Sequence, residues 1–203
     1  MTGPLSVPPP SIPGHGLLTG RKAVITAAAG TGIGSAFLYN GVLVPNTELA
    51  SAAGLSVDNG IVIDDQARTS DPDIVAAGDC TSHTMARYGS RIRLESVSSA
   101  GEQAKIAAAT ICGKHSAIAA LPWFWSDQYD LKLQIAGLPL NADRRIERGD
   151  PDGSSFAVFH LAGDRIVCVE AVNAPPEFMA GKQLIGKRTP VALDKLGDPT
   201  VSM

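Results

Sequence analysis

A glycine–aspartate pair, Gly78-Asp79, is the feature of this sequence that most directly suggests ligand binding. It ends the run Thr69–Asp79, which predicts a turn and then a short buried strand. In open α/β sheets, ligands bind in the crevice outside the carboxyl ends of the strands. Glycine there lets a ligand approach the backbone closely, and an aspartate accepts hydrogen bonds from sugar hydroxyls. A plain surface turn capped by Asp79 is the competing interpretation.

A long helix downstream strengthens the ligand interpretation. Apolar residues recur at helical spacing over Val97–Cys112, and Gly113 is suited to end the helix. Ser96 stands at the amino end, where a hydroxyl can cap a free backbone N–H group. The same end of a helix stabilises a nearby anion by roughly 0.3–1 kcal/mol.

An aromatic segment, Pro122–Tyr129, follows this helix and contains Trp123 and Trp125. If the segment is extended, we expect one tryptophan to face the core and the other to face a cleft. The alternative is that both fill a seam between two domains, because tryptophan buries a large apolar area.

A second ligand-binding pattern lies near the amino terminus. The run Arg21–Thr26 predicts a strand, which leads into a loop with Gly30, Gly32 and Gly34. A strand followed by such a loop can hold a dinucleotide pyrophosphate, since glycines remove side chains from the path of the ligand. The run resembles the opening of short-chain dehydrogenases, but the Tyr and Lys pair of that family, four residues apart, is missing. A flexible glycine turn is the alternative.

Two patterns of secondary structure divide the rest of the chain. The expected elements are a strand at Gly41–Asn46, a helix at Glu48–Ala53, a strand at Gly60–Asp64, then strands at Asp130–Gly137, Arg144–Arg148, Ser154–His160 and Arg165–Ala171, and a helix at Pro175–Gly186. The first pattern predicts an α/β domain, and the second predicts a small α+β domain around an antiparallel sheet. The expected boundaries are a disordered proline-rich lead at 1–16, the strand and glycine-rich loop at 17–40, the two domains at 41–118 and 119–186, and a loose tail at 187–203.

Composition narrows the function classes. The chain has 203 residues, 44% of them hydrophobic, and a formal net charge of −3, which argues against nucleic-acid binding. It contains neither an apolar stretch long enough to span a bilayer nor the pattern of a secretory signal. The sparse cysteines, Cys80, Cys112 and Cys168, fit reduced thiols in the cytoplasm. The four histidines show no metal-ligand spacing, and we expect each to lie on the surface or in a loop.

Four motifs in a fixed order carry a family resemblance. They are Val44–Ala50, Thr69–Asp79, Leu94–Val97 and Trp123–Tyr129. From about Gly41 onward, the chain resembles the FAD-dependent ferredoxin reductases of oxygenase systems, of the putidaredoxin and rhodocoxin reductase type. The resemblance implies a partial FAD-binding, Rossmann-like domain followed by the small carboxyl-terminal domain of those enzymes.

The resemblance also implies roles for individual residues. Gly78-Asp79 would contact the ribityl or phosphate portion of FAD, and the backbone at Val97 would meet the flavin ring. Trp125 would lie beside the isoalloxazine, near the docking site of a [2Fe–2S] ferredoxin. Glu95 and Ser96 precede Val97 in the same motif, and Glu95 and Gln103 are expected only as polar contacts at the helix border.

The reaction of the family would be hydride transfer from NADH to FAD and then single-electron transfer to the ferredoxin. A local basic patch, Arg87, Arg91 and Arg93, could attract an acidic ferredoxin.

Two parts of the family pattern are missing from the sequence: the amino-terminal motif for the ADP half of FAD and the inserted NADH-binding domain. We therefore expect a fused or truncated reading frame, joined near Phe37–Gly41, whose uncovered sheet edge could form a homodimer. Two alternatives stay open: a short-chain dehydrogenase remnant that binds NAD(P), and a non-catalytic module for ferredoxin docking or dimerisation.

Overall fold

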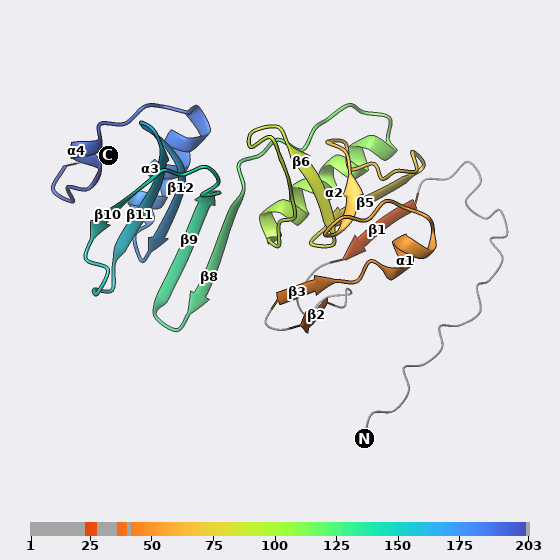
Figure 1. Ribbon diagram of the computed structural model, residues 1–203, viewed down its shortest axis with the longest axis horizontal. Helices are drawn as coiled ribbons and strands as arrows, with labels where there is room; N and C mark the ends of the chain where they lie inside the picture. Colours follow the sequence, from red (N-terminus) through yellow and green to blue (C-terminus); the bar gives the residue numbers. More distant parts are fainter. Residues whose placement is uncertain (1–22, 28–35, 40–41, 202–203) are drawn as a thin grey trace, which may run out of the picture.

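The computed structural model describes residues 23–27, 36–39 and 42–201. Two parts lie side by side, and a single extended connection joins the end of the first to the start of the second (Figure 1). The first part carries a long helix against short strands, and the second is dominated by one antiparallel sheet. This arrangement confirms the predicted fold class.

The amino-terminal part is built from small sheets around one helix. Its elements are β1 (Ala23–Ala27), β2 (Ala36–Tyr39), β3 (Val42–Pro45), α1 (Glu48–Ala52), β4 (Ile61–Ile63), β5 (Ile74–Gly78), β6 (Thr81–Met85), β7 (Ser90–Ile92) and α2 (Val97–Ile111). Strand β5 runs parallel to β1, and β6 lies between β4 and β7. Helix α2 packs against β5, and together they bury a core that includes Val75, Ala76, Ile106 and Ala107.

The turn before β4 shows why the sequence could predict that strand. Asn59 and Gly60 both have positive φ angles, of 49° and 129°. A Cβ atom on Gly60 would lie 2.9 Å from the carbonyl oxygen of Cys80, so only glycine fits there. The predicted Asn-Gly turn and the strand behind it are both confirmed.

Strands β6 and β7 were not expected from the sequence, because β6 is mostly polar. Its residues Thr81 and Ser82 are nevertheless buried. The Ser82 hydroxyl donates a hydrogen bond to the Asp58 carbonyl oxygen at 2.7 Å, and the Thr81 hydroxyl lies 2.8 Å from the Gly78 carbonyl oxygen. Buried polar side chains are tolerated when they form hydrogen bonds. The polar composition of β6 therefore did not predict that this strand lies in the core.

The placement of His83 corrects the expectation that every histidine lies on the surface or in a loop. His83 is in β6 and is only 1% exposed. Neither of its ring nitrogens forms a hydrogen bond with a described residue. Burial lowers the pKa of its imidazole below the ordinary value, which makes the neutral ring the dominant form at pH 7.

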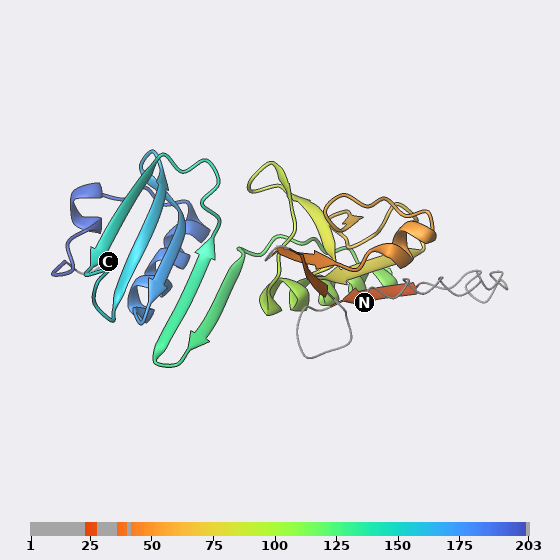
Figure 2. The same cartoon turned by 60° about the horizontal axis from the view of Figure 1, so that its bottom comes forward.

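The carboxyl-terminal part is an antiparallel sheet backed by a helix. Its elements are β8 (Trp123–Gln128), β9 (Leu131–Gly137), β10 (Arg144–Gly149), β11 (Phe156–Ala162), β12 (Arg165–Val172), α3 (Pro175–Lys187) and α4 (Leu193–Leu196). The five strands follow the order β10-β11-β12-β9-β8, so β8 and β10 are the edges. Helix α3 covers the middle of one face (Figure 2), and its Gly181 sits directly against Val169. The predicted strands, the hairpin between β11 and β12 and the closing helix are confirmed.

The last residues of the described chain correct the expectation of a loose tail. Arg148 in β10 is 5% exposed, and its guanidinium donates hydrogen bonds to the carbonyl oxygens of Leu196, Asp198 and Val201. Leu196 is itself buried in the core of the sheet. The sequence after Lys187 has no long run of periodic apolar residues, so the sequence alone could not predict that Arg148 anchors this segment.

Within the described residues, no helix combines the length and the apolar character needed to cross a membrane.

The Arg148 anchor generates a stability prediction. Arg148→Met should lower the free energy of unfolding by about 2–4 kcal/mol, because it strips several carbonyl oxygens of a buried donor. The measurement is equilibrium unfolding in urea. Arg145→Met is the matched control: Arg145 is exposed and, among the described residues, forms an ion pair with Glu147 alone, so its loss should cost less than about 1 kcal/mol. Equal losses in the two variants would contradict the anchoring role.

Candidate functional site

The Gly78-Asp79 turn lies at the carboxyl end of a buried strand, as the sequence predicts. Gly78 ends β5 with a φ angle of 97°, a backbone conformation that favours glycine. Asp79 follows and is 8% exposed. On the neighbouring strand, Ala27 pairs with Gly78, so β1 and β5 end at the same edge of their sheet. Gly30, Gly32 and Gly34, the glycines expected to form a nucleotide loop, lie outside the described residues.

One side chain of helix α2 holds this turn. The side-chain oxygen of Gln103 accepts a hydrogen bond from the Gly78 backbone N–H at 2.6 Å and lies 2.8 Å from the Thr81 hydroxyl. Gln103 is 1% exposed, and its amide nitrogen reaches Ser99 at 3.4 Å. The sequence assigned Gln103 only a border contact. The available signal was a polar residue on the apolar, inward face of a predicted helix.

Arg93 ties the turn to the segment before α2. It reaches the Asp79 carbonyl oxygen at 3.4 Å and forms an ion pair with Glu95. The Arg93 side chain is only 9% exposed, so this guanidinium is a structural link. Glu95 is therefore connected to the strand-end turn through Arg93, a connection that the spacing of the residues did not reveal.

The predicted basic patch of Arg87, Arg91 and Arg93 does not exist as one surface. Arg91 pairs with Asp58 at 3.4 Å, while Arg87 donates a hydrogen bond to the Ile185 carbonyl oxygen in the other part of the chain. Arg91 lies on β7, Arg87 lies before it and Arg93 after it, and each of the three side chains contacts a different neighbour.

The amino end of α2 has a side-chain cap and is exposed to solvent. Ser96 is the residue before the first helical turn, and its hydroxyl accepts a hydrogen bond from the Ser99 N–H at 3.2 Å, as predicted. Val97, the first helical residue, is 71% exposed. Free backbone N–H groups at this end are therefore accessible to a ligand.

The two tryptophans of β8 correct one expectation. Residues two apart in a strand share a face, and the rings of Trp123 and Trp125 stack with their centroids 5.1 Å apart. Trp123 packs on the core beside Phe178, whereas Trp125 is 37% exposed. The expected difference in burial between Trp123 and Trp125 is present, but it arises because the two residues lie at different positions along the same face of β8.

The aromatic pair is joined to the helix end and to a cation. The Ser98 hydroxyl donates a hydrogen bond to the Trp123 carbonyl oxygen, which attaches β8 to the first turn of α2. The Lys182 ammonium lies 4.2 Å from the centroid of the Trp123 ring. Burial lowers the pKa of Lys182 from its ordinary value. Hydrogen bonds thus connect the strand end to α2 and the amino end of α2 to Trp123, and ring stacking connects Trp123 to the exposed Trp125.

This arrangement is suited to binding rather than to nucleophilic chemistry. Its chemical resources are accessible backbone N–H groups, a carboxylate and an exposed aromatic ring. The buried Cys168 thiol has a pKa raised to about 12 by desolvation, so it is protonated at neutral pH. These groups fit the ring and ribityl portions of a flavin. Gly78 leaves space beside the strand end, the amino end of α2 can stabilise negative charge, and Trp125 offers an aromatic surface nearby.

Comparisons with known proteins agree with this geometry. A family model described as Reductase C-terminal matches residues 123–203, and one described as Pyridine nucleotide-disulphide oxidoreductase matches residues 30–104. Putidaredoxin reductase of Pseudomonas putida is 50% identical over 161 residues, which cover 79% of this chain and 38% of that protein. Rhodocoxin reductase of Rhodococcus erythropolis is 40% identical over 180 residues, covering 88% of this chain and 42% of that protein.

A solved structure gives the same match in three dimensions. The crystal structure of the covalent putidaredoxin reductase–putidaredoxin complex aligns with a TM-score of 0.74 and 51% identity, covering 79% of this chain and 38% of that one. The chain thus spans about two fifths of the length of these curated relatives.

The Gln103 link generates a second prediction. Gln103→Leu should lower the free energy of unfolding by about 1–3 kcal/mol, because the buried Gly78 N–H loses its acceptor. Urea unfolding measures this, with Gln183→Leu on the exposed side of α3 as the control, expected to lie within about 0.5 kcal/mol of the unsubstituted protein. If the two variants are equally stable, Gln103 does not hold the turn.

Proposed function

Because this chain belongs, from about residue 41 onward, to the FAD-dependent ferredoxin reductases, we propose that it forms the flavin-contacting part of an NADH:ferredoxin reductase. One observation carries the proposal. The Gly78-Asp79 turn is hydrogen-bonded through Gln103 to the same helix whose amino end opens to solvent at Val97. The link holds two ligand-binding elements as one unit, as a long flavin nucleotide requires.

In this proposal, Asp79 holds the ribityl or phosphate portion of FAD by accepting or organising hydrogen bonds, and Gly78 leaves room for it beside the strand. The amino end of α2 stabilises negative charge at the pyrimidine end of the ring through the backbone at Val97. Ser96 caps the helix, and Glu95 positions the preceding segment through Arg93. FAD, when bound, supplies the hydride-accepting and electron-transferring group.

The proposal extends to a partner. Trp125 is exposed on an edge strand, with the Lys182 cation over its stacked neighbour. We assign this face to docking of a [2Fe–2S] ferredoxin, since the related putidaredoxin reductase forms a complex with putidaredoxin and Trp125 offers an exposed aromatic anchor. Docking alone, without flavin, is the second candidate function, because this face belongs to the carboxyl-terminal part.

NADH oxidation and ferredoxin reduction are proposed as the activity to which this chain contributes its flavin-contacting residues. The domain boundaries at residues 41 and 119 and association into a homodimer through an exposed sheet edge belong to the same proposal. So does a cytoplasmic location, which the three free cysteines favour.

Flavin binding is the direct test. The purified chain should take up FAD, seen as absorbance near about 450 nm that remains after desalting, and Asp79→Asn should weaken FAD binding about 10–100-fold by removing a charged hydrogen-bond acceptor. The exposed Asp73, in the turn before β5, provides the control Asp73→Asn, with unchanged affinity expected. A colourless chain that binds NADH would favour the dehydrogenase alternative, and equal losses in both variants would refute the role of Asp79.

Ferredoxin docking has its own test. Trp125→Ala should weaken binding of a [2Fe–2S] ferredoxin about tenfold or more, because an exposed aromatic anchor is lost. Surface plasmon resonance measures this, and Tyr129→Ala at the fully exposed tip of the β8–β9 hairpin is the aromatic control. Binding that survives Trp125→Ala unchanged would remove the docking assignment, and binding by colourless protein would support the docking module.

A further inference from the structure

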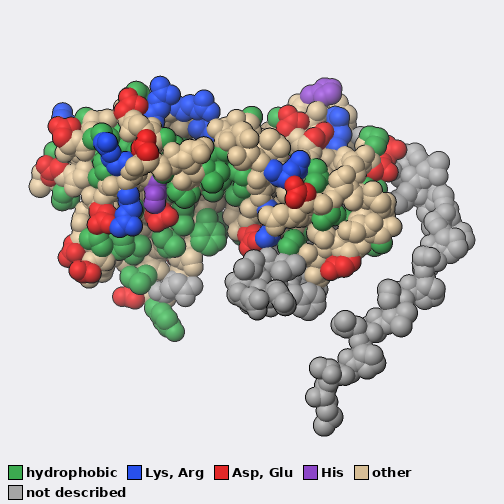
Figure 3. All heavy atoms as spheres, in the orientation of Figure 1, with side chains coloured by type: hydrophobic (Ala, Val, Ile, Leu, Met, Phe, Trp, Pro, Cys, Tyr) green, Lys and Arg blue, Asp and Glu red, His purple; other side chains and the backbone are tan. Residues whose placement is uncertain are grey.

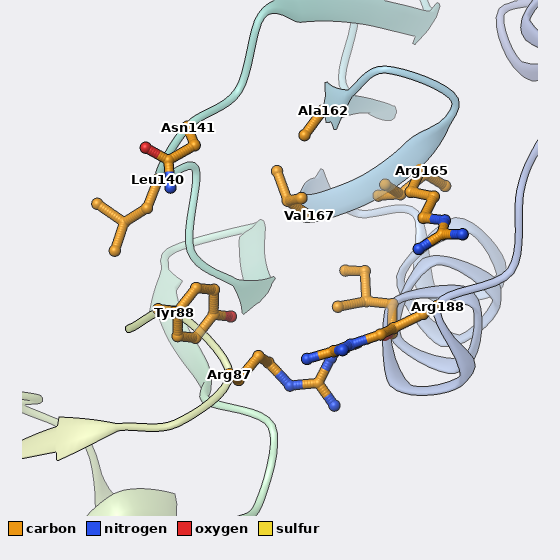
Figure 4. Close-up of a pocket in the computed structure, with 10 residues that line it drawn as sticks. Arg87, Tyr88, Leu140, Asn141, Ala162, Arg165, Val167 and Arg188 are labelled. Carbon is orange, nitrogen blue, oxygen red and sulfur yellow. Dashed lines mark hydrogen bonds between the residues drawn. The ribbon is translucent and has the colours of Figure 1, made fainter. Parts of the chain in front are cut away.

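A cavity of about 370 Å³ lies between the two parts of the chain, away from the residues assigned to flavin. Arg87 and Tyr88 reach it from the turn between β6 and β7. Leu140 and Asn141 come from the loop after β9, while Arg165 and Arg188 come from the start of β12 and the end of α3 (Figure 4). The cavity is large enough for a small ligand.

Three arginines, Arg87, Arg165 and Arg188, line this cavity. No Asp or Glu is among its lining residues. Among the described residues, Arg165 forms an ion pair with the neighbouring Asp164 alone, at 3.9 Å, and both side chains are exposed. Arg87 and Arg188 form no ion pair with any residue in the described part of the chain.

Figure 4 shows Arg87 and Arg188 at one end of the cavity, with the guanidinium of Arg165 pointing toward that end. Arg87 uses Nη1 to donate a hydrogen bond to the Ile185 carbonyl oxygen at 3.1 Å, which leaves its other donors available. Neighbouring like charges repel, and an anion between them would remove that cost. Arginine is also the side chain best suited to bind a planar carboxylate or a phosphate through two parallel hydrogen bonds.

The opposite wall is apolar. The ring of Tyr88 and the side chains of Leu140 and Val167 line it. Burial raises the pKa of the Tyr88 phenol, so the hydroxyl is protonated at neutral pH and can donate a hydrogen bond. Asn141 adds amide donors at the rim.

We propose that this cavity binds a small organic anion, whose phosphate or carboxylate group is held by Arg87, Arg165 and Arg188 and whose apolar body packs against Tyr88 and Leu140. Arg87 and Tyr88 belong to the amino-terminal part, and the other residues belong to the carboxyl-terminal part. A bound anion therefore bridges the two parts and stabilises their association. The site shares no residue with the flavin assignment, so either can fail without the other.

The test is isothermal titration of the full chain with phenyl phosphate, benzoate and inorganic phosphate at low ionic strength. We expect at least one aromatic anion to bind more tightly than inorganic phosphate. Tighter binding of phenyl phosphate identifies a phosphate ester as the natural group, and tighter binding of benzoate identifies a carboxylate. Inorganic phosphate binding as tightly as both aromatic anions, or no binding of any probe at millimolar concentration, would overturn the proposal.

The variants Arg188→Gln and Arg165→Gln should each weaken binding of the better probe about tenfold, because both side chains are exposed and can be replaced without disturbing the core. Arg144→Gln is the matched control, since Arg144 is an exposed arginine of the same sheet outside the cavity. An equal loss in Arg144→Gln would show attraction to overall positive charge and would overturn the site. Circular dichroism of each variant confirms that the fold is retained.

Discussion

The hydrogen bond from the Gly78 backbone to the Gln103 side chain is the constraint on which the candidate site depends. It lies in a buried environment, where an unpaired N–H group would be costly, so the strand end and the helix cannot move independently. Through the same helix, Ser96 caps the open amino end and Ser98 attaches the aromatic strand β8. The side chain of Gln103 therefore sets the distance between the Gly78-Asp79 turn and α2, the two elements that we propose contact the flavin.

Among the described residues, few polar contacts hold the two parts of the chain together, and the Glu102 carboxylate of α2 accepts two of them from the backbone N–H groups of Ala119 and Ala120. Ser98 contacts Trp123 at one end of the junction, and Arg87 contacts Ile185 at the other. Lysine and arginine side chains gather along the upper edge of the carboxyl-terminal part (Figure 3), and the arginine-lined cavity opens between the parts. A junction with so few direct contacts is a natural place for ligand or partner binding to alter how the parts associate.

Much of this architecture was predictable because it rests on local rules. The Asn59-Gly60 turn, the apolar strand before Gly78, the serine cap at Ser96 and the hairpin at Gly163 each depend on the conformational preferences of a few adjacent residues. The prediction was wrong where tertiary burial overrode composition. β6 is polar yet buried, His83 is in the core, and the segment after Lys187 is fastened by Arg148, a residue distant in sequence.

The sequence by itself determined the order of the elements and the identity of the residues that carry the family motifs, because these depend on local propensity and on short patterns. Only the tertiary structure decided which of those residues share a site. Gln103 accepts a hydrogen bond from Gly78, which lies 25 residues away in the sequence. Arg87 lines a cavity together with Arg165 and Arg188, and its sequence neighbours Arg91 and Arg93 do not line that cavity. Such partnerships are set by the packing of α2 on β5 and of one part on the other, and no local pattern records them.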